Sequence, residues 1–178
     1  MRTRTRLCFL VVLVFVAASQ APPAQAQEQR VHRDTKQHYE IRVPESFVFR
    51  TAGDLLGSYQ GSQPTTMSIS RISYPSLPAW RKKQKDEFID QVISGARQSV
   101  KGYRQNSKKS HRVGGVPTLD FHFSRGLKGS QELVWMRFLF FRRYALVASA
   151  STSSTTKSVH KKRAKEFTLS LSPARPGS

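Results

Sequence analysis

The sequence has almost no cysteine and few acidic residues. Cys8 is its single cysteine, and 11 Asp and Glu residues stand against 30 Lys and Arg in 178 residues. Because no thiol follows Cys8, the rest of the chain has neither a disulfide framework nor a cysteine-based metal or redox site. The scarcity of carboxylates also leaves few candidates for the paired acids that hydrolases use.

Recognisable catalytic motifs are missing too. The chain after residue 26 has no G-x-S-x-G elbow, no H-E-x-x-H zinc motif and no glycine-rich phosphate loop. Asp120 and His122 alternate on one predicted strand, but no second ligand cluster accompanies them, so a solvent-facing pair is the favoured interpretation. We therefore assign no catalytic, cofactor-binding or metal-binding residue and expect a non-enzymatic protein. A hydrolase with an unrecognised site is the less favoured alternative.

Residues 1–26 carry the pattern of a cleavable secretory signal peptide. Three arginines lie among the first six residues, an apolar run covers Leu7–Ala18, and Ala24-Gln25-Ala26 has the A-x-A form of a cleavage site. Twelve apolar residues are too few to cross a bilayer as a helix, which needs about 20. We expect an exported protein, periplasmic or extracellular, with no membrane span after cleavage.

Cleavage would leave a strongly basic domain. Since residues 1–26 hold three arginines and no acid, 27 Lys and Arg remain against 11 Asp and Glu, a net charge of +16 over 152 residues. Such a charge attracts anionic surfaces without selecting one. Export favours anionic lipid, cell-wall polymer, polysaccharide or an acidic envelope protein over nucleic acid. The alternative, that the charge only keeps the domain soluble, stays open.

Two groups of residues are candidate contacts. Lys161, Lys162, Arg163 and Lys165 form the densest basic block after residue 26 and are candidate anion contacts. Trp80 and Arg81 precede the longest predicted helix and are candidate partner contacts, because Trp and Arg contribute strongly to interfaces. Trp80 has a structural alternative, as a staple at the helix entrance.

The chain divides into a signal peptide (1–26), a flexible leader (27–37), one domain (38–172) and a disordered tail (173–178). Alternation of apolar and polar residues predicts strands over 38–44, 47–50, 55–60, 67–73, 118–124, 132–141 and 144–151. Helical periodicity covers 78–102, with Gly102 as a left-handed cap, and a shorter helix is predicted over 155–169, where a Ser or Thr would cap the first turn. These elements predict an α+β fold, an antiparallel sheet of about six strands with both helices packed on it.

The order of these elements resembles the PsbP-like, or Mog/PsbP-like, fold family. The resemblance covers residues 38–172 and rests on "HYEIRVPESF", "TMSISRISYP", "KDEFIDQVISGARQSV", "VGGVPTLDFHFSRG", "ELVWMRFLFFRRYALVASAS" and "TKSVHKKRAKEFTLSLS". It implies an antiparallel sheet with helices packed on it and no shared chemistry. Its members include extrinsic subunits that steady a photosynthetic metal cluster, small-GTPase binders and exported bacterial proteins without an assigned role.

Two hypotheses of function follow from these observations. The favoured one is an exported accessory or binding protein of the cell envelope that docks on an envelope protein or an anionic envelope component. The alternative is a direct binder of a polyanion such as a cell-wall polymer, an anionic lipid or a polysaccharide. Neither requires a cofactor.

Overall fold

The structure, a computed structural model, describes residues 29–50, 52–59, 64–73, 87, 89–91, 93–94, 97–98, 100–127 and 129–174. The signal peptide lies outside the described residues, as do Trp80, Arg81 and the tail from residue 175 onward. The hypotheses about these segments therefore stay predictions.

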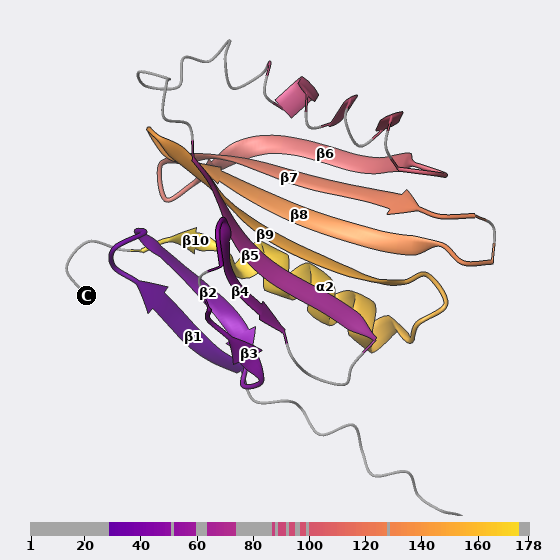
Figure 1. The fold of residues 1–178 in the computed structure, drawn as a ribbon, viewed down its shortest axis with the longest axis horizontal. Helices are drawn as coiled ribbons and strands as arrows, with labels where there is room; N and C mark the ends of the chain where they lie inside the picture. The colour runs from indigo at the N-terminus through magenta and orange to yellow at the C-terminus, as the bar shows by residue number, and fades with distance from the viewer. Residues whose placement is uncertain are drawn as a thin grey trace, which may run out of the picture.

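Two antiparallel sheets make up the fold (Figure 1). The larger has seven strands in the order β3-β4-β5-β9-β8-β7-β6, and the smaller has three in the order β1-β2-β10. The strands of the larger sheet are β3 (Phe47–Val48), β4 (Leu55–Tyr59), β5 (Thr65–Ser73), β6 (Arg104–Val113), β7 (Val116–Arg125), β8 (Glu132–Phe140) and β9 (Tyr144–Ser153). Those of the smaller are β1 (Gln29–Asp34), β2 (Tyr39–Pro44) and β10 (Ser172–Pro173). The α+β class is confirmed.

Helices cover opposite faces of the large sheet. Helix α2 (Ser158–Ser170) packs on β9, β8 and β5, where its Phe167 joins a core cluster with residues of β2 and β5. The first predicted helix is represented by described helical residues between 87 and 98, and its Ile89 and Ile93 are buried in a second cluster with Phe121 of β7. Side chains of β7 alternate between the two faces of the large sheet. Its odd-numbered apolar residues pack against the first helix, and its even-numbered residues face α2.

Two local predictions are confirmed. The β8–β9 turn lies at Arg142-Arg143, where the Phe141 amide donates to the Tyr144 carbonyl over 2.9 Å. Gly102 has φ +68°, and a Cβ there would lie 2.1 Å from the Gly126 carbonyl oxygen. Only glycine fits this position, because both its conformation and its surroundings exclude a side chain.

The predicted flexible leader over residues 27–37 is wrong, because ordered structure begins at Gln29 and not at His38. Strand β1 pairs with β2 along its whole length. Arg30 donates to the Phe47 carbonyl over 2.9 Å, and the His32 ring stacks on Phe49 with 3.6 Å between centroids. An edge strand with mostly exposed side chains carries no apolar alternation, so its sequence resembles a loop.

Strand β6 was missed for the same reason. All but two of its side chains are exposed, and its sequence, RQNSKKSHRV, is almost entirely polar. It is held by a main-chain ladder to β7, and exposed edge strands commonly carry charged residues that discourage pairing with other molecules.

The ends of α2 and the start of the tail also differ from expectation. No Ser or Thr caps α2: its N-cap is Lys157, which makes no side-chain cap bond. The disordered tail predicted over 173–178 is wrong for its first two residues, because Pro173 pairs with Tyr39 of β2 and the Ala174 amide donates to the His38 carbonyl over 3.0 Å.

Candidate functional site

The site is organised around Arg137, a buried cation near the middle of β8. Its side chain is 7% exposed. Its Nε and one terminal nitrogen donate to the two carboxylate oxygens of Asp120 over 2.6 and 2.8 Å. This bidentate pair satisfies the charge that burial would otherwise leave unpaired.

Arg137 also holds the C-terminal end of α2. Its other terminal nitrogen donates to the Leu169 carbonyl over 2.5 Å and to the Leu171 carbonyl over 3.4 Å. The last turn of α2 has no basic residue of its own. Since the end of a helix carries partial negative charge and unpaired carbonyls, the guanidinium of β8 supplies the missing cation.

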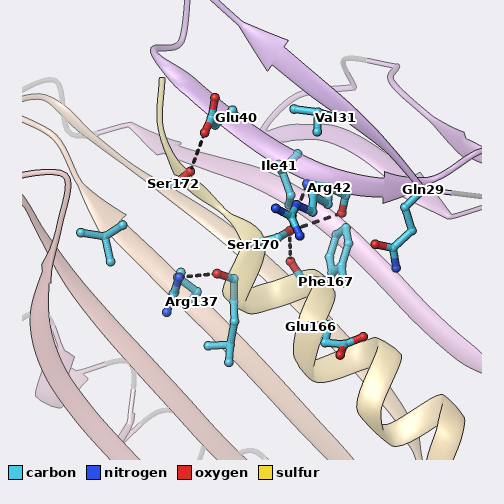
Figure 2. A pocket seen from close by; sticks show the side chains of 12 residues that line it. Gln29, Val31, Glu40, Ile41, Arg42, Arg137, Glu166, Phe167, Ser170 and Ser172 are labelled. Atoms are coloured by element: carbon cyan, nitrogen blue, oxygen red, sulfur yellow. Dashed lines mark hydrogen bonds between the residues drawn. The ribbon is translucent and has the colours of Figure 1, made fainter. Parts of the chain in front are cut away.

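A groove of about 640 Å³ opens beside this helix end (Figure 2). Residues of β1 and β2 form one wall, the last turns of α2 form the other, and Arg137 and Val113 contribute from the large sheet. A hydrogen bond joins the two walls, because the Ser170 hydroxyl of α2 accepts from the Arg42 amide of β2 over 3.0 Å. The groove is lined by Gln29, Val31, Glu40, Ile41, Arg42, Val113, Arg137, Glu166, Phe167, Leu169, Ser170 and Ser172.

The lining is close to neutral and carries exposed apolar side chains. Glu40 and Glu166 offset Arg42 and Arg137 in charge. Val31 is 61% exposed and Leu169 is 39% exposed, two of the four large apolar side chains exposed in the described residues. A groove of this kind suits an apolar contact better than an anion.

The solvent-facing interpretation of Asp120 and His122 is wrong. Asp120 is bound by Arg137, and the His111 Nε2 lies 3.6 Å from its carboxylate. His122 stacks on Trp135 of β8, with ring centroids 4.8 Å apart and planes 6° from parallel. Trp135 is only partly buried and packs at the margin of the α2-side cluster. Arg137 is a lone arginine within an otherwise apolar stretch of strand, a sequence signal that could have indicated a buried acidic partner but was not used.

The basic block Lys161, Lys162, Arg163 and Lys165 lies on α2, and none of its four residues lines the groove. Lys162 lies 3.8 Å from Glu166 and is one of the most exposed side chains of the helix. Burial, and then the charge of Lys165, lower the pKa of His122 in β7. Lys161 lies one turn before Lys165 on the same helix side, and Arg163 lies on another.

No group of three potential metal ligands comes together within the described ranges. In the same part of the chain, no helix has the length and apolar character needed to cross a membrane.

The sequence matches no protein-family model and no curated protein. Solved structures are similar to this chain at low identity. A Pseudomonas aeruginosa protein of unknown function is 13% identical over 83% of this chain and 98% of its own, with a TM-score of 0.52. The cyanobacterial PsbP protein CyanoP of Synechocystis is 12% identical over 84% of this chain and 95% of its own, with a TM-score of 0.56.

LpqN of Mycobacterium tuberculosis, described as involved in cell envelope biogenesis, is 11% identical over 83% of this chain and 91% of its own, with a TM-score of 0.52. At such identities the similarity concerns the fold alone. The chain has the PsbP-like fold that its order of elements predicted.

Proposed function

We propose that this protein is an exported, non-enzymatic accessory protein of the cell envelope that binds a segment of another envelope protein in the groove beside α2. The observation that carries the proposal is the pair of exposed apolar side chains, Val31 and Leu169, on a groove of about 640 Å³. Exposed apolar surface of this kind is typical of protein interaction sites.

The polar groups of the groove favour an apolar contact over recognition of a charged ligand. Arg137 is already bonded to Asp120 and to the carbonyls of α2. Ser172 donates to Glu40, and Arg33 pairs with the same carboxylate. Because these groups are engaged within the protein, burying apolar area is the main source of affinity left to a partner.

The envelope setting is supported by two independent observations. The N-terminal sequence predicts export, and LpqN, which shares the fold, is described as involved in cell envelope biogenesis. Chemistry is not part of the proposal, because the hydroxyl–carboxylate pair of the groove, Ser172 and Glu40, is long at 3.3 Å and its carboxylate is also paired with Arg33.

Crosslinking in the native envelope tests the proposal. The tagged protein is compared with the double variant Val31→Gln and Leu169→Gln, and with a control that changes the other two exposed apolar residues, Leu127→Gln and Val159→Gln. All four side chains are exposed, so both variants should fold, as circular dichroism would verify.

We expect a partner protein to be recovered with the parent and the control, and recovery with the groove variant to fall to background. Recovery of no protein partner, or equal recovery with both variants, would overturn the proposal.

A further inference from the structure

Strand β6 is the last strand of the seven-stranded sheet, and one of its sides has no neighbour in that sheet (Figure 1). Its main chain bonds to β7 on one side, and among the described residues no strand bonds to it on the other. Every residue from Arg104 to Ser110 is exposed, including Ser107, whose side chain is short. Because so short a side chain is exposed only where little lies over it, the outer main-chain groups of β6 are accessible to a further strand.

The register of β6 defines the length of this accessible edge. A bulge interrupts the pairing with β7 between Gln105 and Ser107, and the pairing is continuous from Ser107 to Val113. In a regular antiparallel strand, every second residue directs its N–H and C=O groups away from the strand it already pairs with. Val113 lines the groove, so the stretch left for an added strand is Ser107–Arg112.

The charge along this edge has one sign. Strand β6 contains no Asp or Glu, and its basic residues are Arg104, Lys108, Lys109 and Arg112. Lys108 lies 3.4 Å from Asp90, but the Asp90 side chain is 74% exposed, so water screens this attraction. Lys109 is in register with Asp120, whose carboxylate already binds Arg137. Most of the positive charge of β6 is therefore available to an external partner.

Basic side chains lie on both faces of the sheet beside this edge. Side chains alternate along a strand, so Lys109 lies on the face that carries α2, whereas Lys108 and Arg112 lie on the opposite face. A strand added to β6 would meet basic side chains on both of its own faces.

A second copy of β6 is a poor partner for such an edge. Two copies would bring lysine and arginine side chains together, and like charges directly opposite each other in a sheet are destabilising. A strand with Asp or Glu opposite the basic residues instead gains a favourable cross-strand pair at each of them. The charge that discourages self-association thus selects a strand of opposite sign.

We propose that β6 adds an extended acidic segment of another protein to the large sheet, with Asp or Glu opposite Lys108, Lys109 and Arg112. Main-chain hydrogen bonds to Ser107–Arg112 supply the affinity, and the paired charges select the partner. None of the residues 107–112 lines the groove. The proposal can therefore hold or fail independently of the proposed function.

Peptide binding to the chain from residue 27 onward tests the proposal. The probe is a peptide with blocked ends, VETVEET. When it runs antiparallel to β6 with its first residue opposite Val113, its glutamates lie opposite Arg112, Lys109 and Lys108. A second peptide keeps the same side chains but carries N-methyl groups in place of its main-chain N–H groups, so it cannot donate to β6. Both are titrated in about 0.15 M NaCl, which screens the long-range attraction of the net charge.

Two variants with equal change of charge locate the site. The edge variant carries Lys108→Glu and Lys109→Glu. The control carries Arg142→Glu and Arg143→Glu, an adjacent pair of exposed residues in the β8–β9 turn. Thermal melting verifies that both variants fold.

We expect the edge variant to weaken binding of VETVEET at least about tenfold, because two favourable cross-strand pairs become repulsive. The control should change the affinity less than about threefold. The N-methylated peptide should bind at least about tenfold more weakly than VETVEET, since it lacks the main-chain donors. In NMR-detected hydrogen exchange, VETVEET should slow the amides of Ser107–Arg112 and leave those of β1 unchanged.

Equal weakening by the two variants, equally tight binding of the N-methylated peptide, or unchanged exchange in Ser107–Arg112 would overturn the proposal. Sedimentation of the protein without peptide tests the other occupant of the edge. A dimer that the edge variant dissociates would assign β6 to a second copy of this chain and would equally overturn it.

Discussion

Arg137 shows how one residue organises its surroundings. Its guanidinium binds Asp120 of the neighbouring strand and two carbonyls at the end of α2, so a single buried side chain joins three elements. A buried charge is stable only while its partners are present. The position of α2, and with it one wall of the groove, therefore depends on this residue.

Replacing Arg137 with Met should lower the free energy of unfolding by about 2–4 kcal/mol, because Asp120 and the carbonyls of α2 would lose their donor. Adding Asp120→Val should restore part of the loss, since no unpaired carboxylate would remain. Urea unfolding measures both.

The matched control is Arg125→Met on the same strand pair. Arg125 and Glu132 form an ion pair that is much more exposed than Arg137 and Asp120. Loss of the exposed Arg125–Glu132 pair should lower the free energy of unfolding by less than about 1 kcal/mol. If Arg125→Met and Arg137→Met lower the free energy of unfolding equally, burial of the Arg137–Asp120 pair is not the reason for its contribution to stability.

At the scale of the element, β1 is the strand that changes the interpretation of the N-terminus. It is an edge strand whose Gln29 and Val31 line the groove. Its attachment depends on pairing with β2, on the bond from Arg30 to the Phe47 carbonyl and on the stacking of His32 on Phe49. A segment that resembles a leader in sequence is thus part of the domain.

Deleting residues 27–37 from a chain that otherwise begins at residue 27 should lower the melting temperature by several degrees. The deletion removes the β2 ladder and the His32–Phe49 contact, which a flexible leader would not provide. Differential scanning calorimetry measures the change.

A chain that lacks only the last four residues, 175–178, controls for truncation of a terminus as such. Equal melting temperatures for the chains starting at residues 27 and 38 would mean that β1 adds no stability.

At the scale of the whole molecule, two histidines at distant places make stability depend on pH. Burial lowers the pKa of His32 in β1, with Arg30 adding to the effect and Asp34 opposing it. Burial and then Lys165 lower the pKa of His122 in β7. Both imidazoles are thus held neutral in the fold, whereas in the unfolded chain they take up a proton near pH 6.5.

Stability should therefore be full above about pH 6.5 and fall as the pH decreases toward the folded pKa values, because the unfolded state binds more protons there. Urea unfolding between pH 5 and 8 tests this, in 0.3 M NaCl to screen the net positive charge. The double variant His32→Phe and His122→Phe keeps both ring contacts and removes both titrations. Its free energy of unfolding should therefore change less with pH. If the double variant loses stability as steeply as the parent when the pH falls, the two histidines are not the source of the pH dependence.

Much of the protein was predictable from local sequence. Gly102 was predicted because a left-handed conformation at a helix end favours glycine, and the Arg142-Arg143 turn was placed by the predicted strands on either side of it. The strands β7, β8 and β9 were found because each buries alternate side chains and so shows a period of two. The candidate groove was not predicted: the residues named as anion contacts, Lys161, Lys162, Arg163 and Lys165, do not line it, and Arg137 was not named.

The sequence by itself determined the charge, the absence of thiols after Cys8 and the α+β class, because these follow from composition and from periodicity within short segments. Only the tertiary structure decided that β1 and β6 are strands, since polar edge strands are held by main-chain bonds that leave no side-chain pattern. It also paired Arg137 with Asp120 and bonded Arg137 to the end of α2. These contacts depend on strand register and helix docking, which are fixed by packing across the whole fold.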